Sequence, residues 1–220
     1  MNKKEKKSKT VFGAHEWACT TANFIKGCTN DCKYCFGKES GIRYQRNTPE
    51  NWAIEVIDMK KLKKVPKKKD GVIMFPSTHD ITPANIEFAL VFLANLLKNG
   101  NKVLVVTKPH LSVIERICET FSDKKNNILF RFTIGSCDNA TLKFWEPNAT
   151  SFEERLESLK YAYDKGFQTS VSSEPLLDID VDPLIDKLSP YVTDAIWIGK
   201  PNFLIRRLKI NGVLDDVTEQ

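Results

Sequence analysis

Short apolar runs bounded by turn residues alternate along this chain with longer segments of helical periodicity. Such runs are typical of buried strands when they are four to eight residues long. They predict six strands, over residues 20–25, 71–75, 102–107, 128–134, 167–173 and 195–198. Strands that alternate with helices across short connections favour a parallel sheet with right-handed crossovers.

The strongest helical pattern lies between the second and third predicted strands. We expect Thr82 to cap this helix, Pro83 to open it and Gly100 to close it. Apolar residues over 86–97 follow the spacing of one buried helix face. A second amphipathic pattern, over 111–121, predicts a helix before the fourth strand.

Capping signals predict the other helices. Ser151 and Glu154 form a capping-box pattern, and the helix that follows should turn Leu156, Leu159 and Tyr163 inward. Thr48 followed by Pro49 predicts another helix start, and a weaker pattern covers 183–188.

Six strand–helix units close part of an eight-unit barrel, so the predicted fold is α/β, a partial (βα)6 barrel of the TIM type. The active site of such a fold lies at the carboxyl ends of the strands. We expect three segments: a disordered basic tail over 1–12, the partial barrel over 13–205 and a C-terminal tail over 206–220.

Three cysteines with the spacing C-x3-C-x2-C follow the first predicted strand: Cys28, Cys32 and Cys35. Three thiolates are one too few for a closed zinc site or a fully protein-ligated four-iron cluster. Either Cys19 or His15 supplies a fourth zinc ligand, or a four-iron cluster keeps one iron without a protein ligand. The spacing favours the cluster. A disulfide framework is disfavoured because the chain shows no signal peptide and has enough apolar residues for a core.

The cysteine spacing, with Tyr34 directly before Cys35, resembles the signature of the radical SAM superfamily. The resemblance implies a [4Fe-4S] cluster whose open iron chelates the amino and carboxylate groups of S-adenosylmethionine. An electron from the cluster then releases a 5′-deoxyadenosyl radical, which abstracts hydrogen from a substrate. The six-unit open barrel also resembles the fold of that superfamily.

Several sequence segments, most of them at the predicted strand ends, resemble those of the spore photoproduct lyase-like group. They are Ser77–Asp80, Val105–Lys108, Phe132–Ile134, Glu146–Arg155 and Val171–Leu177. This resemblance implies that Lys108 and Ser136 belong to the cofactor site. The chain departs from the group at Ser77, where the spore enzyme has a cysteine that donates a hydrogen atom. A serine O–H bond is too strong for that role.

Polar residues at the strand ends are the other candidate cofactor contacts. Ser77, Thr78, His79 and Asp80 are candidates for the methionine amino group, although Asp80 also suits a turn. Lys108 could pair with the methionine carboxylate, and Ser136 could bond the carboxylate or the ribose. We expect Glu174 near the adenosine and Tyr34 beside the adenine. The alternative for Lys108 is an ordinary solvated lysine, and the alternative for Tyr34 is ordinary half-buried packing.

The chain carries a net charge of +5, and much of the excess lies in two lysine clusters, at Lys3–Lys9 and Lys60–Lys69. Either cluster could follow a phosphate backbone, or could simply be solvated. No apolar run approaches the roughly 20 residues that span a bilayer, and no apolar segment follows the basic start Met1–Lys7, so we expect no secretion. We therefore expect no membrane partner and a cytoplasmic location.

The leading hypothesis is a radical SAM enzyme, lyase-like or oxidoreductase, that acts on an unidentified substrate, with nucleic acid as a candidate. It would need a reductant protein such as flavodoxin or ferredoxin. Two alternatives are a zinc-containing basic module that binds nucleic acid without catalysis, and a degenerate relative that keeps the cluster but has lost turnover. The sequence leaves the substrate, the electron donor and the oligomeric state open.

Overall fold

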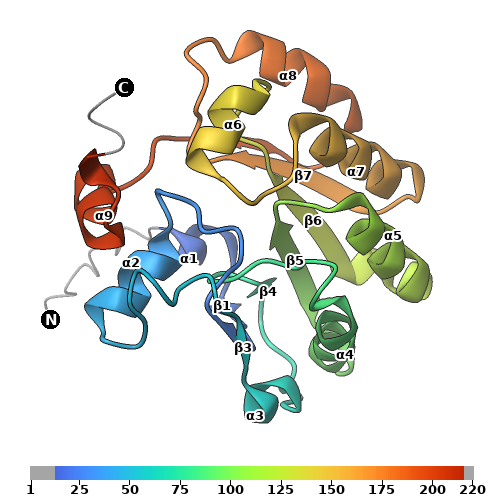
Figure 1. Cartoon of the computed structure of the whole chain (residues 1–220). Helices are drawn as coiled ribbons and strands as arrows, with labels where there is room; N and C mark the ends of the chain where they lie inside the picture. The colour runs from blue at the N-terminus through green and yellow to red at the C-terminus, as the bar shows by residue number, and fades with distance from the viewer. Residues whose placement is uncertain (1–12, 216–220) are drawn as a thin grey trace, which may run out of the picture.

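A six-stranded parallel sheet forms the centre of the computed structural model, which describes residues 13–215 (Figure 1). Its strands follow one another in space in chain order. They are β1 (Thr20–Thr21), β4 (Val72–Phe75), β5 (Lys102–Thr107), β6 (Ile128–Thr133), β7 (Gln168–Ser173) and β8 (Ile196–Ile198). Every neighbouring pair is parallel. The predicted α/β fold with six parallel strands, an open partial barrel, is confirmed.

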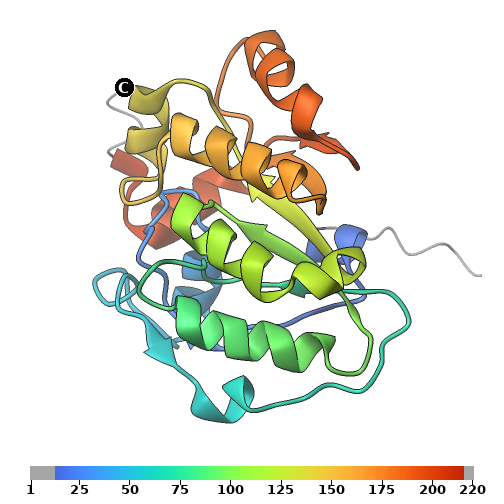
Figure 2. The ribbon, with the colours of Figure 1, turned by 90° about the vertical axis from the view of Figure 1, so that its right-hand side faces the viewer.

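Helices between the strands cover the outer face of this sheet. Three of them, α4 (Ile86–Leu97), α5 (Leu111–Thr120) and α7 (Phe152–Asp164), lie side by side (Figures 1 and 2). The shorter helix α8 (Asp182–Leu188) follows β7. The remaining elements are α1 (Ala14–Trp17), β2 (Ile25–Lys26), α2 (Phe36–Arg43), β3 (Val56–Ile57), α3 (Met59–Leu62), the 3-10 helices Ser122–Asn127 and Ser189–Tyr191, α6 (Asn139–Trp145) and α9 (Leu204–Asn211).

Alternate strand residues divide the core into two parts. One set of side chains, including Phe75, Val105 and Phe130, packs against the helices in the main cluster. The other set, including Met74 and Leu104, faces the concave side of the sheet. There the segment around α1 packs against the sheet through Ala14, Trp17 and Ala18.

The first strand is shorter than predicted because the chain leaves the sheet after Thr21. The Asn23 side chain takes over the bonding: its Oδ1 accepts from the backbone N–H groups of Ser77 and Thr78 at 2.8 and 3.0 Å. Residues 25–26 then pair antiparallel with β3 in a separate two-stranded ribbon.

Two predicted helix starts are wrong. No helix begins at Thr48: its N–H donates to Asn51 Oδ1 at 2.9 Å and residues 49–53 form turns. Ile54, which would lie on the apolar face of such a helix, is 64% exposed. The helix expected at Thr82 begins at Ile86, because the Asn85 side chain accepts the Thr82 N–H at 3.0 Å and holds an intervening turn.

The helix after Ser151 forms as predicted, with the Ser151 hydroxyl accepting from Glu154 N–H at 3.3 Å. Tyr163 does not face inward, since it is 40% exposed, and the charged Arg155 is fully buried instead. Helix α6 was not predicted, and α9 covers part of the predicted C-terminal tail. The predicted tail over 1–12 lies outside the described residues. Within residues 13–215 no helix has the length and apolar character needed to cross a bilayer.

Candidate active site

A cavity of about 200 Å³ lies at the carboxyl ends of the central strands. The cysteine loop forms one wall, and residues that follow β4, β5 and β7 form the others. Most of the predicted site residues line it: Cys28, Cys32, Tyr34, Cys35, Ser77, Thr78, His79, Asp80, Lys108 and Glu174. The strand order therefore brings together residues that are up to 146 positions apart in the chain, as between Cys28 and Glu174.

Backbone contacts fix the shape of the cysteine loop. Cys28 N–H donates to the Trp52 carbonyl at 2.9 Å. Just before it, Gly27 has a φ of +87°, and a Cβ there would lie 2.3 Å from the Ile54 carbonyl oxygen. Only glycine fits this close approach. At the far end of the loop, Cys35 caps α2 and its sulfur accepts from Lys38 N–H at 3.3 Å.

The C-terminal helix α9 holds the same loop from outside. The Asn211 side chain is buried, and its Nδ2 donates to the carbonyls of Lys33 at 2.9 Å and Cys35 at 3.2 Å. These carbonyls flank the second and third cysteines. The loop is thus fixed by contacts with residues on both sides of it in the sequence.

The three cysteine side chains are free thiols; Cys28 and Cys32 are buried, and Cys35 is partly exposed. Burial raises the pKa of Cys32 to about 12, and it raises the pKa of Cys28 and Cys35 as well. The charges of the other two cysteines raise the pKa of Cys28 further, because the three groups lie close together. A bound cation would reverse this preference and hold the sulfurs as thiolates.

The cysteines fit an iron–sulfur cluster better than a zinc ion. Among residues 13–215, no three His, Cys, Asp or Glu side chains converge on a single metal position. In a [4Fe-4S] cluster each cysteine binds a different iron, so the sulfurs need not meet at one point. The expected fourth zinc ligands, Cys19 and His15, do not line the cavity. The Cys19 thiol donates to Val72 O at 3.2 Å, at the amino end of β4.

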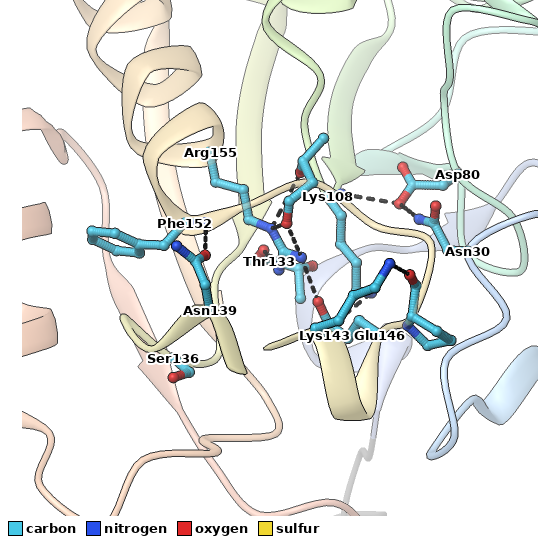
Figure 3. Close-up of polar contacts among 12 residues, drawn as sticks. Asn30, Asp80, Lys108, Thr133, Ser136, Asn139, Lys143, Glu146, Phe152 and Arg155 are labelled. Atoms are coloured by element: carbon cyan, nitrogen blue, oxygen red, sulfur yellow. Dashed lines mark hydrogen bonds and ion pairs between the residues drawn. The ribbon is translucent and has the colours of Figure 1, made fainter. Parts of the chain in front are cut away.

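Asp80 connects the cysteine loop to the ends of β4 and β5 (Figure 3). Its Oδ2 accepts from Asn30 Nδ2 at 2.8 Å and from Lys108 N–H at 3.0 Å. Its Oδ1 accepts from Ile81 N–H at 2.8 Å and from the Thr107 hydroxyl. Burial raises the pKa of Asp80. Because four protein donors already occupy both oxygens, this carboxylate positions the walls of the cavity.

Lys108 belongs to a buried network of charges centred on Glu146 (Figure 3). Glu146 accepts from the Tyr34 hydroxyl, pairs with Arg155 Nη2 at 2.6 Å and lies 3.9 Å from Lys108 Nζ. Burial alone would lower the pKa of Lys108, but the surrounding acidic groups outweigh it and raise that pKa well above its usual value. Lys108 is therefore a fixed cation at the cavity wall.

His79 faces the cavity from an aromatic cluster. Its ring makes edge contacts with Phe24 and Phe75, at centroid separations of 5.2 and 6.1 Å. Neither ring nitrogen has a hydrogen-bond partner among the described residues. Burial lowers the pKa of His79 to about 3, so the imidazole is neutral at neutral pH.

Ser136 does not reach the cavity. Its hydroxyl donates to Asp178 and accepts from Asp138 N–H at 2.8 Å, and Figure 3 shows it apart from Asp80 and Lys108. Glu174 does line the cavity, at the end of β7, where Ser172 Oγ donates to it at 3.4 Å. Partial burial raises the pKa of Glu174.

The positioning residues Asn30, Glu146, Arg155 and Asn211 were not predicted from the sequence. Of these four residues, Arg155 could have been identified from the sequence. Arg155 occupies the buried face of α7, between Phe152 and Leu159, where an apolar residue is expected. A charge at such a position implies a buried partner. Glu146 could be identified only as the buried partner that Arg155 requires. Asn30 and Asn211 have no signal in a single sequence, because their partners lie far away along the chain.

Comparisons with known proteins agree with this architecture. Residues 22–182 match the model of the radical SAM superfamily. An uncharacterized protein of Methanocaldococcus jannaschii is 26% identical over 170 residues, which are 75% of this chain and 64% of that protein.

Solved structures of spore photoproduct lyase have the same fold. One variant, solved with AdoMet and dinucleoside spore photoproduct, superposes with a TM-score of 0.60 at 15% identity, over 86% of this chain and 58% of that one. A second variant gives 0.60 at 13% identity, over 89% and 65%. The chain therefore spans about three fifths of the length of these relatives.

The buried network makes a prediction about stability. Glu146→Ala should lower the free energy of unfolding by about 3–5 kcal/mol, because it leaves Lys108 and Arg155 buried without their shared carboxylate. Urea unfolding would measure this loss. The control is Glu87→Ala, which removes an exposed ion pair with Arg116 at 2.8 Å and should cost about 1 kcal/mol or less. Equal losses in the two variants would contradict the network.

Proposed function

The chain belongs to the radical SAM superfamily and so works with a [4Fe-4S] cluster and S-adenosylmethionine, and we propose that it abstracts hydrogen from its substrate by means of the 5′-deoxyadenosyl radical. The observation that carries this proposal is the cavity at the strand ends. It brings three free thiols, two of them buried, into one cavity with a fixed cation, Lys108. When bound, the cluster would supply the electron that cleaves the sulfonium C–S bond of S-adenosylmethionine.

We assign Cys28, Cys32 and Cys35 as the cluster ligands. Their support is the C-x3-C-x2-C spacing, the shared cavity and the lack of a fourth nearby cysteine, which leaves one iron for the cofactor. Asp80 and Asn211 act on these ligands indirectly, by holding the loop that carries them.

We assign the other cavity residues to different groups of S-adenosylmethionine. We assign Lys108 to the methionine carboxylate, because a buried lysine with a raised pKa stays charged. Ser77 and Thr78 suit the methionine amino group, and neutral His79 lies beside them. Glu174 suits the ribose hydroxyls, and the Tyr34 ring provides an apolar surface for the adenine. Ser136, which bonds Asp178 outside the cavity, is left out of this assignment.

Ser77 stands where the spore enzyme is expected to have its hydrogen-donating cysteine. Ser77 lines the cavity, and the cysteines Cys118 and Cys137 do not. We therefore propose that no thiol of this chain, apart from the cluster ligands, returns a hydrogen atom to the product radical. Repair of the spore lesion does not follow from the shared fold, and the reaction remains lyase-like or oxidoreductive. Such chemistry suits a reducing cytoplasm, with flavodoxin or ferredoxin as electron donor.

A groove of about 550 Å³ supports nucleic acid as the substrate class. Lys61, Lys64, Lys67 and Lys69 line it, beside the free edge of β1. Asn23 belongs to this groove and also donates to Ser77 Oγ in the cavity at 2.8 Å. A phosphate backbone held by the lysines would thus pass next to the candidate active site.

The cluster assignment predicts the metal content and the reaction of anaerobically reconstituted protein. We expect about four irons and four sulfides per chain, and 5′-deoxyadenosine after reduction with dithionite in the presence of S-adenosylmethionine. Cys28→Ala should lose both, and the matched control Cys19→Ala should keep both. One zinc per chain that is lost in Cys19→Ala would instead establish the zinc alternative. Bound iron without 5′-deoxyadenosine would indicate the degenerate relative.

The groove assignment predicts salt-dependent binding of nucleic acid. Lys64→Glu combined with Lys67→Glu should weaken binding of a single-stranded oligonucleotide by about tenfold or more at low salt, and should reduce the slope of log K against log salt. Fluorescence anisotropy would measure both quantities. Lys165→Glu with Lys187→Glu changes the net charge equally at exposed positions at the end of α7 and on α8, at the opposite edge of the sheet from the groove, and serves as control. Equal weakening in the two double variants would refute a role for the groove.

A further inference from the structure

Rings and arginines alternate along the outer surface of α2 and α9. Arg46 and Arg43 both lie over the Tyr44 ring, at 5.3 and 4.9 Å from its centroid, and Arg206 lies 4.3 Å from the Phe203 ring. Arg43 Nη1 and Arg206 Nε each lie 3.5 Å from the same oxygen of Glu39, so the two halves are continuous. We call these five residues, Arg43, Tyr44, Arg46, Phe203 and Arg206, the arginine–aromatic strip.

The strip is exposed and carries excess positive charge. Tyr44 is 58% exposed and Phe203 is 67% exposed. Glu39 is buried and serves two arginines at once, so one positive charge of that trio is uncompensated. Lys209, exposed one turn beyond Arg206 on α9, adds to it. Large exposed rings beside arginines are typical of protein interaction sites.

The strip lies directly outside the cysteine loop. Helix α2 begins immediately after Cys35, and α9 bonds that loop through Asn211 (Figure 1). Phe36, the first residue of α2, lines the cavity and is 54% exposed, and the Arg207 guanidinium lies 5.4 Å from the centroid of its ring. A protein bound to the strip would therefore lie close to the proposed cluster ligands.

We propose that the arginine–aromatic strip is the docking site of an acidic electron-carrier protein. The proposal rests on the proposed function, since only a redox centre at the cysteine loop requires a donor there. The reduced carrier would pass one electron to a cluster held by this loop and would itself be oxidised by one electron. The positive charge of the strip complements an acidic partner and would speed encounter at low salt.

Two other occupants fit the strip less well. A second copy of this chain would bring two positively charged strips together around a twofold axis, and like charges repel. Nucleic acid could stack on the rings, but the lysine groove lies beside α3, at a different edge of the molecule (Figure 1). The acidic carrier is the occupant that both the charge and the position favour.

Charge reversal tests the proposal without disturbing Glu39. Arg46→Glu combined with Lys209→Glu leaves Arg43 and Arg206 on that buried carboxylate. Lys102→Glu combined with Lys124→Glu changes the net charge equally at the amino end of the sheet, and is the matched control. The probe is an acidic flavodoxin. Biolayer interferometry gives its affinity for each reconstituted protein, and stopped-flow absorbance gives the rate of cluster reduction.

We expect the strip variant to lose about tenfold or more in flavodoxin affinity at low salt and in the rate of reduction by flavodoxin. The control variant should stay within about twofold of the wild type. Both should form 5′-deoxyadenosine with dithionite at the wild-type rate, because a small reductant needs no docking site. This comparison separates a failed docking site from a failed enzyme.

Unchanged flavodoxin affinity in the strip variant would overturn the proposal. So would a selective loss of oligonucleotide binding, or a concentration-dependent dimer of the wild type that the strip variant abolishes. If dithionite yields no 5′-deoxyadenosine in the wild type, the proposed function fails by itself. The flavodoxin affinities then still decide whether the strip binds an acidic carrier.

Discussion

The hydrogen bonds of Asp80 are the constraint on which the rest of the site depends. One buried carboxylate accepts from the cysteine loop through Asn30, and from the end of β5 through the Thr107 hydroxyl and the Lys108 N–H. A buried carboxylate is stable only when its oxygens are satisfied, and here four donors satisfy them. The position of the cysteines relative to Lys108 is therefore set by a group that need not touch any substrate.

Charge is arranged around this constraint in layers. In the interior, Glu146 holds Lys108 and Arg155 in place, so that the cavity keeps a cation at the end of β5. On the surface, the lysine groove adjoins the cavity through Asn23, while the arginine–aromatic strip lies on α2 and α9, outside the cysteine loop. The separation of the two surfaces would allow a substrate and an electron donor to bind at the same time.

Much of this arrangement could be predicted from the sequence. Apolar runs locate the six strands, and their order follows from the alternation with helices, so residues at the strand ends could be placed in one cavity. Ser136 shows the limit of that reasoning. It follows β6 at the carboxyl end of the sheet, but its hydroxyl bonds Asp178 outside the cavity. The predictions of a longer first strand beyond Thr21 and of a helix start at Thr82 fail for a similar reason. In both places an asparagine side chain, Asn23 or Asn85, replaces backbone bonding, and its partners cannot be identified without the fold.

The central claim is that Cys28, Cys32 and Cys35 hold a cluster with one iron open to S-adenosylmethionine. Electron paramagnetic resonance of the reduced, reconstituted protein tests it most directly, with spectra recorded before and after addition of the cofactor. The account predicts the signal of a reduced [4Fe-4S] cluster whose g values shift when S-adenosylmethionine binds, and no such signal in Cys32→Ala. A cluster signal that the cofactor leaves unchanged, or one that survives in Cys32→Ala, would contradict it.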